Sequence, residues 1–309
     1  MLHGKFRIVP FLPSDFVAFS NNSRFTWSVH FPISILGHYG NAVTYMQLRR
    51  GSAHDGKMVV RSFSQETPMT LTEHPRLLAR IAGMFYLIIT ACALFAYLHV
   101  RGQVIDTSNM AQTAANFVAH EKLYRMGIAA AVIVVVCNLP LGWILFQLLK
   151  VVHPRLAQLA LLFITVSATI EAVNIFNYIT PLFTFTMTEY RSAFQPTELQ
   201  ALARGPIRMF DYLFSVSLTF FGVFCALIGY LIVRSKFLPA ILGAAMIVAG
   251  ATYWINAFRL FLALPIPYLP WVTLVAELSL ALWLVVVGVN EEKWRAEAAR
   301  QVNNGLLVP

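Results

Sequence analysis

The chain has 309 residues, of which 58% are hydrophobic and only 12% are charged, and its formal net charge is +9. A soluble globular domain carries roughly a quarter of its residues as charged side chains, so this composition excludes that class. The positive charge is scattered over short separate segments, whereas nucleic-acid binding needs basic residues clustered on one face, so no nucleic-acid partner is expected.

Residues 1–68 differ from the rest of the chain. They contain four of the eight histidines and show neither a period of two nor a period near four. They also lack the charged and then apolar pattern of a signal peptide. We expect a poorly ordered N-terminal extension, with a small cytoplasmic domain as the alternative. A second interpretation is that translation starts at Met69, which would leave the short polar leader MTLTEHPRLLARIAG before the first apolar run.

Six apolar runs follow, each long enough to cross the hydrocarbon core, which takes about 20 residues. The runs are 81–100, 127–149, 156–183, 209–233, 238–264 and 269–289. Runs of this length indicate helices, because a helix satisfies its own backbone hydrogen bonds in lipid. The sequence therefore predicts an all-α polytopic membrane protein, with a bundle of six transmembrane helices in residues 69–290 and a cytoplasmic tail in residues 291–309.

The orientation follows from the short loops, because cytoplasmic loops are enriched in Lys and Arg. The second and third runs are joined by a segment with Lys150 and Arg155, and the fourth and fifth by one with Arg234 and Lys236. The connections on the other side are longer and mix both signs of charge. Both termini are therefore predicted to be cytoplasmic, and the protein is predicted to lie in the cell (inner) membrane.

Polar residues recur at helical spacing inside four of the runs. A helix turns by about 100° per residue, which places Ser167, Glu171, Asn174 and Tyr178 in one stripe. Similar stripes are predicted on the fourth, fifth and sixth runs, formed by Asp211 and Ser215, by Thr252, Asn256 and Arg259, and by Thr273 and Glu277.

The ionisable members of these stripes are all predicted to lie in the outer half of the membrane. Counting about 1.5 Å per residue from the cytoplasmic ends puts Glu171 roughly 22 Å deep and Glu277 about 18 Å deep. Arg259 is deeper still, and Asp211 is near the outer surface. A buried charge costs at least about 2.5–3.5 kcal/mol, so these groups should face inward and form pairs. We expect Arg259 to pair with Glu171, Glu277 or both, and one of the two acids to stay protonated.

The seven candidate residues of this polar cluster are Glu171, Asn174, Tyr178, Asp211, Asn256, Arg259 and Glu277. Two interpretations stay open. Polar groups between helices can act as packing contacts, worth around 0.6 kcal/mol each, which is the preferred interpretation for single Asn or Thr residues. For the three ionisable residues Glu171, Arg259 and Glu277 together, a functional pocket or a proton-linked site is weighed equally.

Four segments resemble a known family. They are RxAGxxYLI at Arg80–Ile88, HEKLYRMGIAA before the second run, the basic turn LLKVVHPRLA, and RSxFLPxxLG at Arg234–Gly243. In this combination the chain is similar, over about residues 76–290, to the bacterial domain-of-unknown-function 4386 (DUF4386) family. The resemblance implies a six-helix integral membrane protein and carries no established activity.

Three classes of function remain from the sequence. The first is a small-solute or proton-linked carrier, or a sensor, that uses the outer-half cluster. The second is an intramembrane lipid-modifying enzyme, which is disfavoured because only three histidines follow His74, none is mid-membrane and no HExxH motif occurs. The third is an accessory subunit of another membrane protein. No catalytic residue, metal or cofactor is predicted, and the expected partners are the lipid bilayer and an unknown small molecule.

Overall fold

The computed structural model describes residues 30–32, 42–50, 58–66 and 74–303. The chain divides into two units, Met1–Thr70 and Leu71–Pro309. The first unit contains an antiparallel sheet in the order β1-β2-β3, formed by His30–Pro32, Ala42–Arg50 and Met58–Glu66. The sequence analysis predicted no regular element here. Both longer strands contain β-branched or aromatic residues, which favour strands even where no clear alternation is present. The sequence analysis also expected poor order in residues 1–68. Apart from the three strands, this expectation concerns residues outside the described ones.

The described part of the second unit is helical, as predicted. Its elements are α1 (Pro75–Ala93), the π-helix η2 (Leu94–Val100), α2 (Arg101–Val104), α3 (Met110–Ala119), α4 (Glu121–Leu149), α5 (Pro154–Thr186), α6 (Thr188–Ala193), α7 (Pro196–Arg234), α8 (Ala240–Phe261), α9 (Pro270–Val286) and α10 (Glu291–Asn303).

Five helices of the described chain are long and apolar enough to span a membrane, and there are six if the bent pair α9 and α10 is counted as one span. The first span is continuous through α1, η2 and α2, at Pro75–Val104. Helix α9 has 17 residues, which is close to the shortest length that crosses a bilayer. Large apolar side chains point outward from the bundle, including Phe176 at 71% exposure and Ile241 at 74%, as expected for surfaces that meet lipid.

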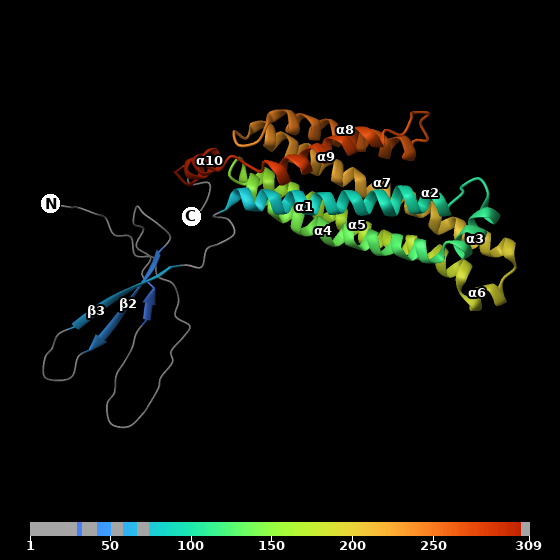
Figure 1. The fold of residues 1–309 in the computed structure, drawn as a ribbon, viewed down its shortest axis with the longest axis horizontal. Helices are drawn as coiled ribbons and strands as arrows, with labels where there is room; N and C mark the ends of the chain where they lie inside the picture. Colours follow the sequence, from blue (N-terminus) through green and yellow to red (C-terminus); the bar gives the residue numbers. More distant parts are fainter. Residues whose placement is uncertain (1–29, 33–41, 51–57, 67–73, 304–309) are drawn as a thin grey trace, which may run out of the picture. The chain divides into compact units, whose positions relative to one another are not determined.

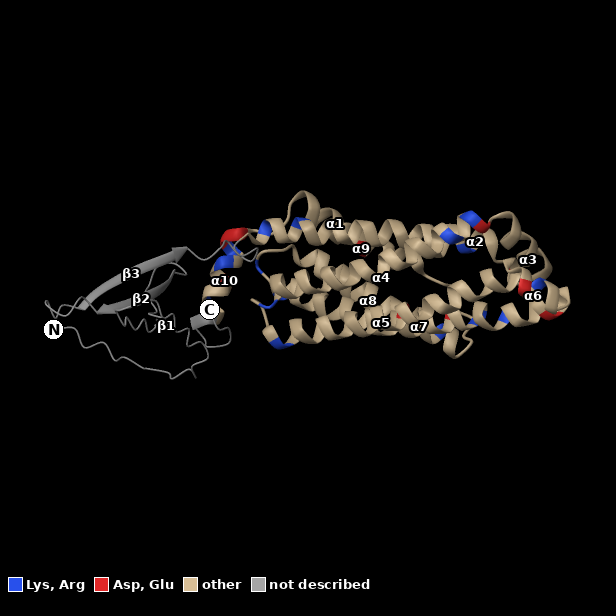
Figure 2. Ribbon diagram, turned by 90° about the horizontal axis from the view of Figure 1, so that it is seen from below, with Lys and Arg blue, Asp and Glu red and all other residues tan. Residues whose placement is uncertain are grey.

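The long helices form a ring in which each helix packs on its neighbours in the chain. The order is α1, α4, α5, α7, α8 and α9, and α9 closes the ring against α1. Helices α2, α3 and α6 gather at one end of the bundle, called here the α3 end, and α10 lies at the other, called the α10 end (Figure 1). Charged residues collect towards both ends and the length between them is mostly uncharged, in keeping with a bundle that crosses a membrane (Figure 2).

Two pairs of glycines bring α7 and α8 into backbone contact. A Cβ atom added to Gly243 would lie 2.5 Å from the carbonyl oxygen of Gly229, and one added to Gly250 would lie 2.5 Å from that of Gly222. The same holds in the reverse direction at Gly229 and Gly222. Small residues allow such close approach in lipid, where dispersion contacts between helices replace the hydrophobic effect. This pair of helices is therefore fixed in register by its glycines.

Helix starts follow local sequence signals. Helices α1, α5, α7 and α9 all begin with a proline, which suits the first helical turn because its missing N–H has no partner there in any case. Helix α7 adds a capping box, in which the Glu198 carboxylate accepts a hydrogen bond of 2.7 Å from the backbone N–H of Gln195.

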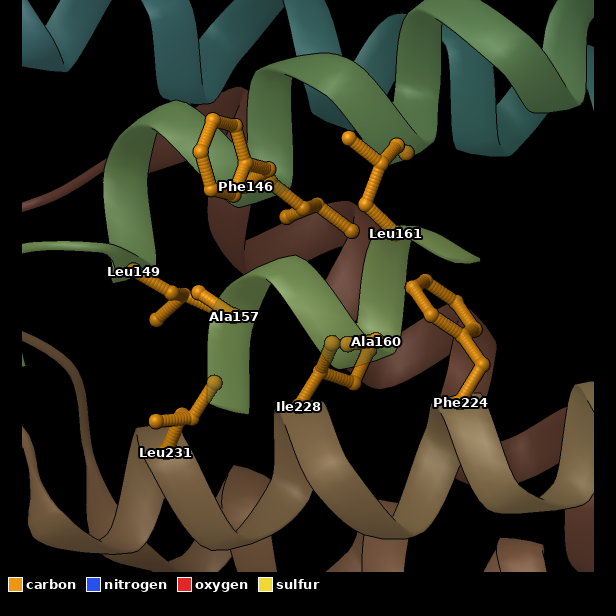
Figure 3. Close-up of a pocket in the computed structure, with 10 residues that line it drawn as sticks. Phe146, Leu149, Ala157, Ala160, Leu161, Phe224, Ile228 and Leu231 are labelled. Atoms are coloured by element: carbon orange, nitrogen blue, oxygen red, sulfur yellow. The ribbon is translucent and has the colours of Figure 1, made fainter. Parts of the chain in front are cut away.

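The buried side chains divide into two clusters. One contains Tyr86, Cys225 and Leu280, and the other contains Tyr178, Phe210 and Tyr124. A hollow within the first cluster, between α4, α5 and α7, is lined by apolar side chains such as Phe146 and Phe224 (Figure 3). It has no room for a water molecule, so it is a packing defect rather than a binding site.

Candidate functional site

Glu171 forms the centre of a polar site inside the bundle, where η2, α5 and α7 meet. Its side chain is buried, at 8% exposure, in the middle of α5. Its Oε1 atom accepts a hydrogen bond of 2.7 Å from the hydroxyl of Tyr97 in η2. The predicted inward position of Glu171 is therefore observed, and its partner is a neutral hydroxyl.

The π-helix η2 places Tyr97 against α5. Each π turn contains more residues than an α turn, and such turns are frequent at functional sites. The carbonyl oxygen of Ala96 in η2 accepts a hydrogen bond of 2.9 Å from the hydroxyl of Tyr178 on α5. Gly127 of α4 leaves space for that hydroxyl, because a Cβ there would lie 2.7 Å from it. Tyr178 thus fixes η2 to α5 through a buried side chain.

Asn174 ties the same face of α5 to α7. Its Nδ2 donates a hydrogen bond of 2.9 Å to the carbonyl oxygen of Phe210, and its Oδ1 accepts one of 3.1 Å from Asn177. Asn174 is completely buried. These contacts match the packing role that the sequence analysis preferred for single asparagines.

Asp211 forms an ion pair with Arg101, the first residue of α2. The distance from Arg101 Nη2 to Asp211 Oδ1 is 2.7 Å, and the two side chains are 12% and 46% exposed. The Arg101 guanidinium lies 4.0 Å from the centre of the Phe210 ring, in a cation–π contact. Its other terminal nitrogen, Nη1, is buried and has no hydrogen-bond partner in the described part of the protein.

Tyr97 and Arg101 contact the same aromatic side chains. The centre of the Tyr97 ring lies 5.9 Å from that of Phe210 and 6.3 Å from that of Tyr178. The Arg101 guanidinium lies over the same two rings. The Tyr97–Glu171 hydrogen bond and the Arg101–Asp211 ion pair are therefore joined by shared aromatic contacts, and Phe214 also packs on Tyr97.

Glu277 belongs to a second site, separate from the first. It accepts a short hydrogen bond from the hydroxyl of Tyr253 on α8. Tyr86 of α1 and Cys225 of α7 are buried in the same hydrophobic cluster as Ala276 and Leu280 of α9. The Tyr86 hydroxyl is buried and unpartnered among the residues that the structure describes. Helices α8 and α9 are thus joined at Glu277, and each of the two buried glutamates has a tyrosine as its partner.

The predicted pairing of Arg259 with Glu171 or Glu277 is wrong. None of the ion pairs of the described residues contains Arg259. Arg259 lies in the last turn of α8, six residues beyond Tyr253, which is about 9 Å along the helix at 1.5 Å per residue. Its guanidinium lies 5.6 Å from the Tyr268 ring centre, where it also faces the negative end of the helix dipole.

The seven predicted residues therefore lie in three places. Glu171, Asn174, Tyr178 and Asp211 come together in the Glu171 site, and Glu277 lies in the second site. Asn256 lies near Arg259 at the end of α8, where its side-chain oxygen accepts a hydrogen bond of 3.1 Å from the backbone N–H of Leu269. Asn256 and Arg259 therefore stabilise the connection from α8 to α9.

Sequence reasoning missed Tyr97 and Arg101. Neither residue is among the seven candidates, since Arg101 lies just beyond the predicted end of the first run at residue 100 and Tyr97 belongs to none of the predicted polar stripes. The structure continues this span to Val104, which brings Arg101 into the bundle. The spacing of four residues between them was the available signal, since such residues share a helix face.

The fold and the sites define a polytopic helical membrane protein with buried carboxyl–tyrosine pairs between its helices. The chain matches the family described as "Domain of unknown function (DUF4386)" over residues 81–288, about two thirds of its length. It belongs to this family, as its sequence motifs predicted. No curated protein and no solved structure matches it.

Proposed function

We propose that the protein is a proton-linked carrier of a small solute in the cell (inner) membrane. In this proposal Glu171 binds and releases the proton, and Arg101 binds the solute. The observation that carries the proposal is the partner of Glu171. A carboxyl group in the middle of a spanning helix is buried against a tyrosine hydroxyl, and no cation contacts it among the described residues.

The chemistry of this pair favours proton binding. A tyrosine hydroxyl provides a hydrogen bond but does not compensate a negative charge. An isolated charge at the bilayer centre costs at least about 2.5–3.5 kcal/mol, and a proton removes that cost. Any rearrangement that admits water or a cation to Glu171 would therefore shift its protonation. Such coupling between protonation and conformation is what a proton-linked carrier requires.

Arg101 supports a solute site next to the proton site. Its Nη1 atom is buried and unpartnered within the described residues, and its Nη2 atom already pairs with Asp211. A guanidinium binds planar acceptors such as carboxylates through two parallel hydrogen bonds. The proposed solute is therefore a small molecule with a carboxylate or a comparable acceptor group, which would compete with Asp211 for Arg101.

The protonation state can be tested by infrared spectroscopy of the full chain in lipid. We expect a carboxylic-acid carbonyl band at neutral pH that is lost in Glu171→Gln. Glu277→Gln is the matched control, because it removes the other buried carboxyl group and should leave the Glu171 band in place. An unchanged spectrum in Glu171→Gln would overturn the proposal.

Transport can be tested in proteoliposomes that contain a pH-sensitive dye. Solutes would first be selected from a panel of small carboxylates and neutral compounds by thermal stabilisation of the wild type. We expect stabilising solutes to drive proton flux in the wild type but not in Glu171→Gln. Stabilisation without flux would indicate a sensor in place of a carrier.

A further inference from the structure

Helix α10 lies across the α10 end of the bundle. It is bent by 99° from α9, so if α9 crosses the membrane, α10 runs along its surface. Trp294 donates a hydrogen bond of 2.9 Å to the carbonyl oxygen of Leu148, and Gln301 donates one of 3.2 Å to that of Val152. These two contacts fix α10 over the connection between α4 and α5.

A cleft of about 440 Å³ opens between α10 and the loop that joins α7 to α8. It is lined by Lys236, Lys293, Ala296, Glu297 and Arg300. This volume lies in the range of small-ligand sites, roughly 300–1,000 Å³. The backbone N–H of Asn290 donates a hydrogen bond of 3.1 Å to the carbonyl oxygen of Phe237, which holds the two sides of the cleft together.

The cleft has more positive than negative charge. Its carboxylate, Glu297, lies 3.6 Å from Arg300 and compensates that residue. Lys236 and Lys293 have no ion-pair partner in the part of the chain that the structure describes. The nearby Glu291 lies 3.6 Å from Arg295, which does not line the cleft. Two ammonium groups are therefore available to an anion.

The position of the cleft indicates which anion it meets. Lys236 follows α7 by two residues, and α7 ends at Arg234, so the ammonium group lies where a spanning helix leaves the hydrocarbon. Lipid phosphate groups occupy that depth. Lysine binds phosphate as a point charge, and basic residues next to spanning helices attract anionic lipids.

We propose that this cleft binds the phosphate of an anionic lipid headgroup, held by Lys236 and Lys293. The site is independent of the Glu171 site, since it uses other residues and lies at the α10 end of the bundle. A lipid bound there would hold α10 at the membrane surface.

The test is native mass spectrometry of the full chain in detergent with added phosphatidylglycerol or phosphatidylcholine of equal acyl chains. We expect tighter binding of phosphatidylglycerol to the wild type. In the double variant Lys236→Gln with Lys293→Gln, we expect that affinity to fall by about tenfold or more, since each basic residue near the surface contributes about one kcal/mol. Binding of phosphatidylcholine should not change.

The matched control is Arg155→Gln with Arg295→Gln, which removes two charges at the same end outside the cleft and should retain the preference. If both double variants lost the same affinity for phosphatidylglycerol, the loss would depend on the total positive charge at this end rather than on the cleft, and the proposal would be overturned. A second arm adds inorganic phosphate without lipid and follows thermal stability. A contrary result is that phosphate stabilises the wild type but not the cleft variant, while neither protein prefers phosphatidylglycerol. That result would assign the cleft to free phosphate and refute a lipid ligand. All four substitutions are at exposed side chains, so the variants should fold.

Discussion

The hydroxyl of Tyr97 lies 2.7 Å from Oε1 of Glu171, although 74 residues separate the two in the chain. The contact joins η2 to α5 and places a neutral donor against a buried carboxyl group. A hydrogen bond of this kind holds the two helices together without a compensating charge. The energetics of the site therefore depend on a hydrogen bond rather than on a salt bridge.

Tyr97→Phe should destabilise the protein by about 1 kcal/mol, the usual net contribution of one buried hydrogen bond. A double-mutant cycle with Glu171→Leu, which removes the acceptor oxygen that Gln would keep, should give a coupling energy of similar size when measured by unfolding in detergent. Tyr212→Phe on the exposed side of α7 is the control and should have little effect. A coupling energy near zero would show that the two side chains do not interact in the folded protein.

The Arg101–Asp211 pair should respond unequally to loss of either partner. Asp211→Ala leaves a guanidinium that is only 12% exposed and cannot lose its proton, so we expect a loss of about 1–3 kcal/mol. Arg101→Met keeps much of the packing and leaves a carboxylate that is 46% exposed and can be hydrated, so its cost should be smaller. Thermal unfolding of the two variants measures the difference, and the reverse order would contradict the burial of Arg101. The exposed pair Glu121–Arg125 provides a control, worth about 0.5 kcal/mol or less.

Gly243→Ala should destabilise the protein by about 1–3 kcal/mol, because the new methyl group would overlap the Gly229 carbonyl of α7. Gly102→Ala in α2 is the matched control. It lies on a helix with no atom near its added Cβ, so helix propensity alone should make it neutral or stabilising by up to about 1 kcal/mol. Unfolding in detergent would compare them, and equal effects would argue against backbone contact between α7 and α8.

The loop before α3 should loosen in acid. Asp106 accepts hydrogen bonds from the backbone and hydroxyl of Ser108 and from the backbone of Asn109, and these bonds lower its pKa below the ordinary value of 3.8. A lowered carboxyl pKa means that the stabilisation is complete above the ordinary value and is lost as the pH falls through the folded pKa. Hydrogen-exchange protection at Ser108 and Asn109 should therefore decrease below pH 3.8. In Asp106→Asn this pH dependence should disappear; its persistence would assign it to another group.

Reporter fusions test the predicted orientation. A fusion after Val289 should report a cytoplasmic position, and one within residues 101–122 an external position, because the short loops at the α10 end carry Lys and Arg. The opposite pattern would mean that the protein has the inverted orientation in the membrane, with the lipid-headgroup cleft on the outer surface.

The order and approximate position of the helices could be predicted from hydropathy, because each spanning segment must be apolar over its whole length. The partners of Glu171 and Glu277 could not. A helical stripe gives the residues that share one face, but not the neighbouring helix that this face meets. Arg259 was assigned to the glutamates by depth counted from the predicted ends of the runs, and its true place in the last turn of α8 removed it from both.

The inward-facing Glu171, Asn174 and Tyr178 were predictable because polar groups avoid lipid. Tyr97 and Arg101 were missed although their spacing of four residues marks a shared helix face, because the first run was predicted to end before Arg101. The three strands of the first unit also lacked a periodic signal. For Tyr97 and Arg101 the local geometry depends on contacts made far away in the sequence, whereas the strands pair with their neighbours in the chain.

The π-helix η2 also divides the continuous first span into two parts that contact different helices. Residues before Leu94 are oriented by α4 and α9, whereas Tyr97 and Arg101 are oriented by α5 and α7. One residue corresponds to about 100° of helix rotation. The number of residues before Tyr97 and Arg101 therefore determines the direction in which these two side chains point. Removing a single residue from 94–96 would leave the span long enough to cross the bilayer, yet it would turn Tyr97 and Arg101 together away from their partners.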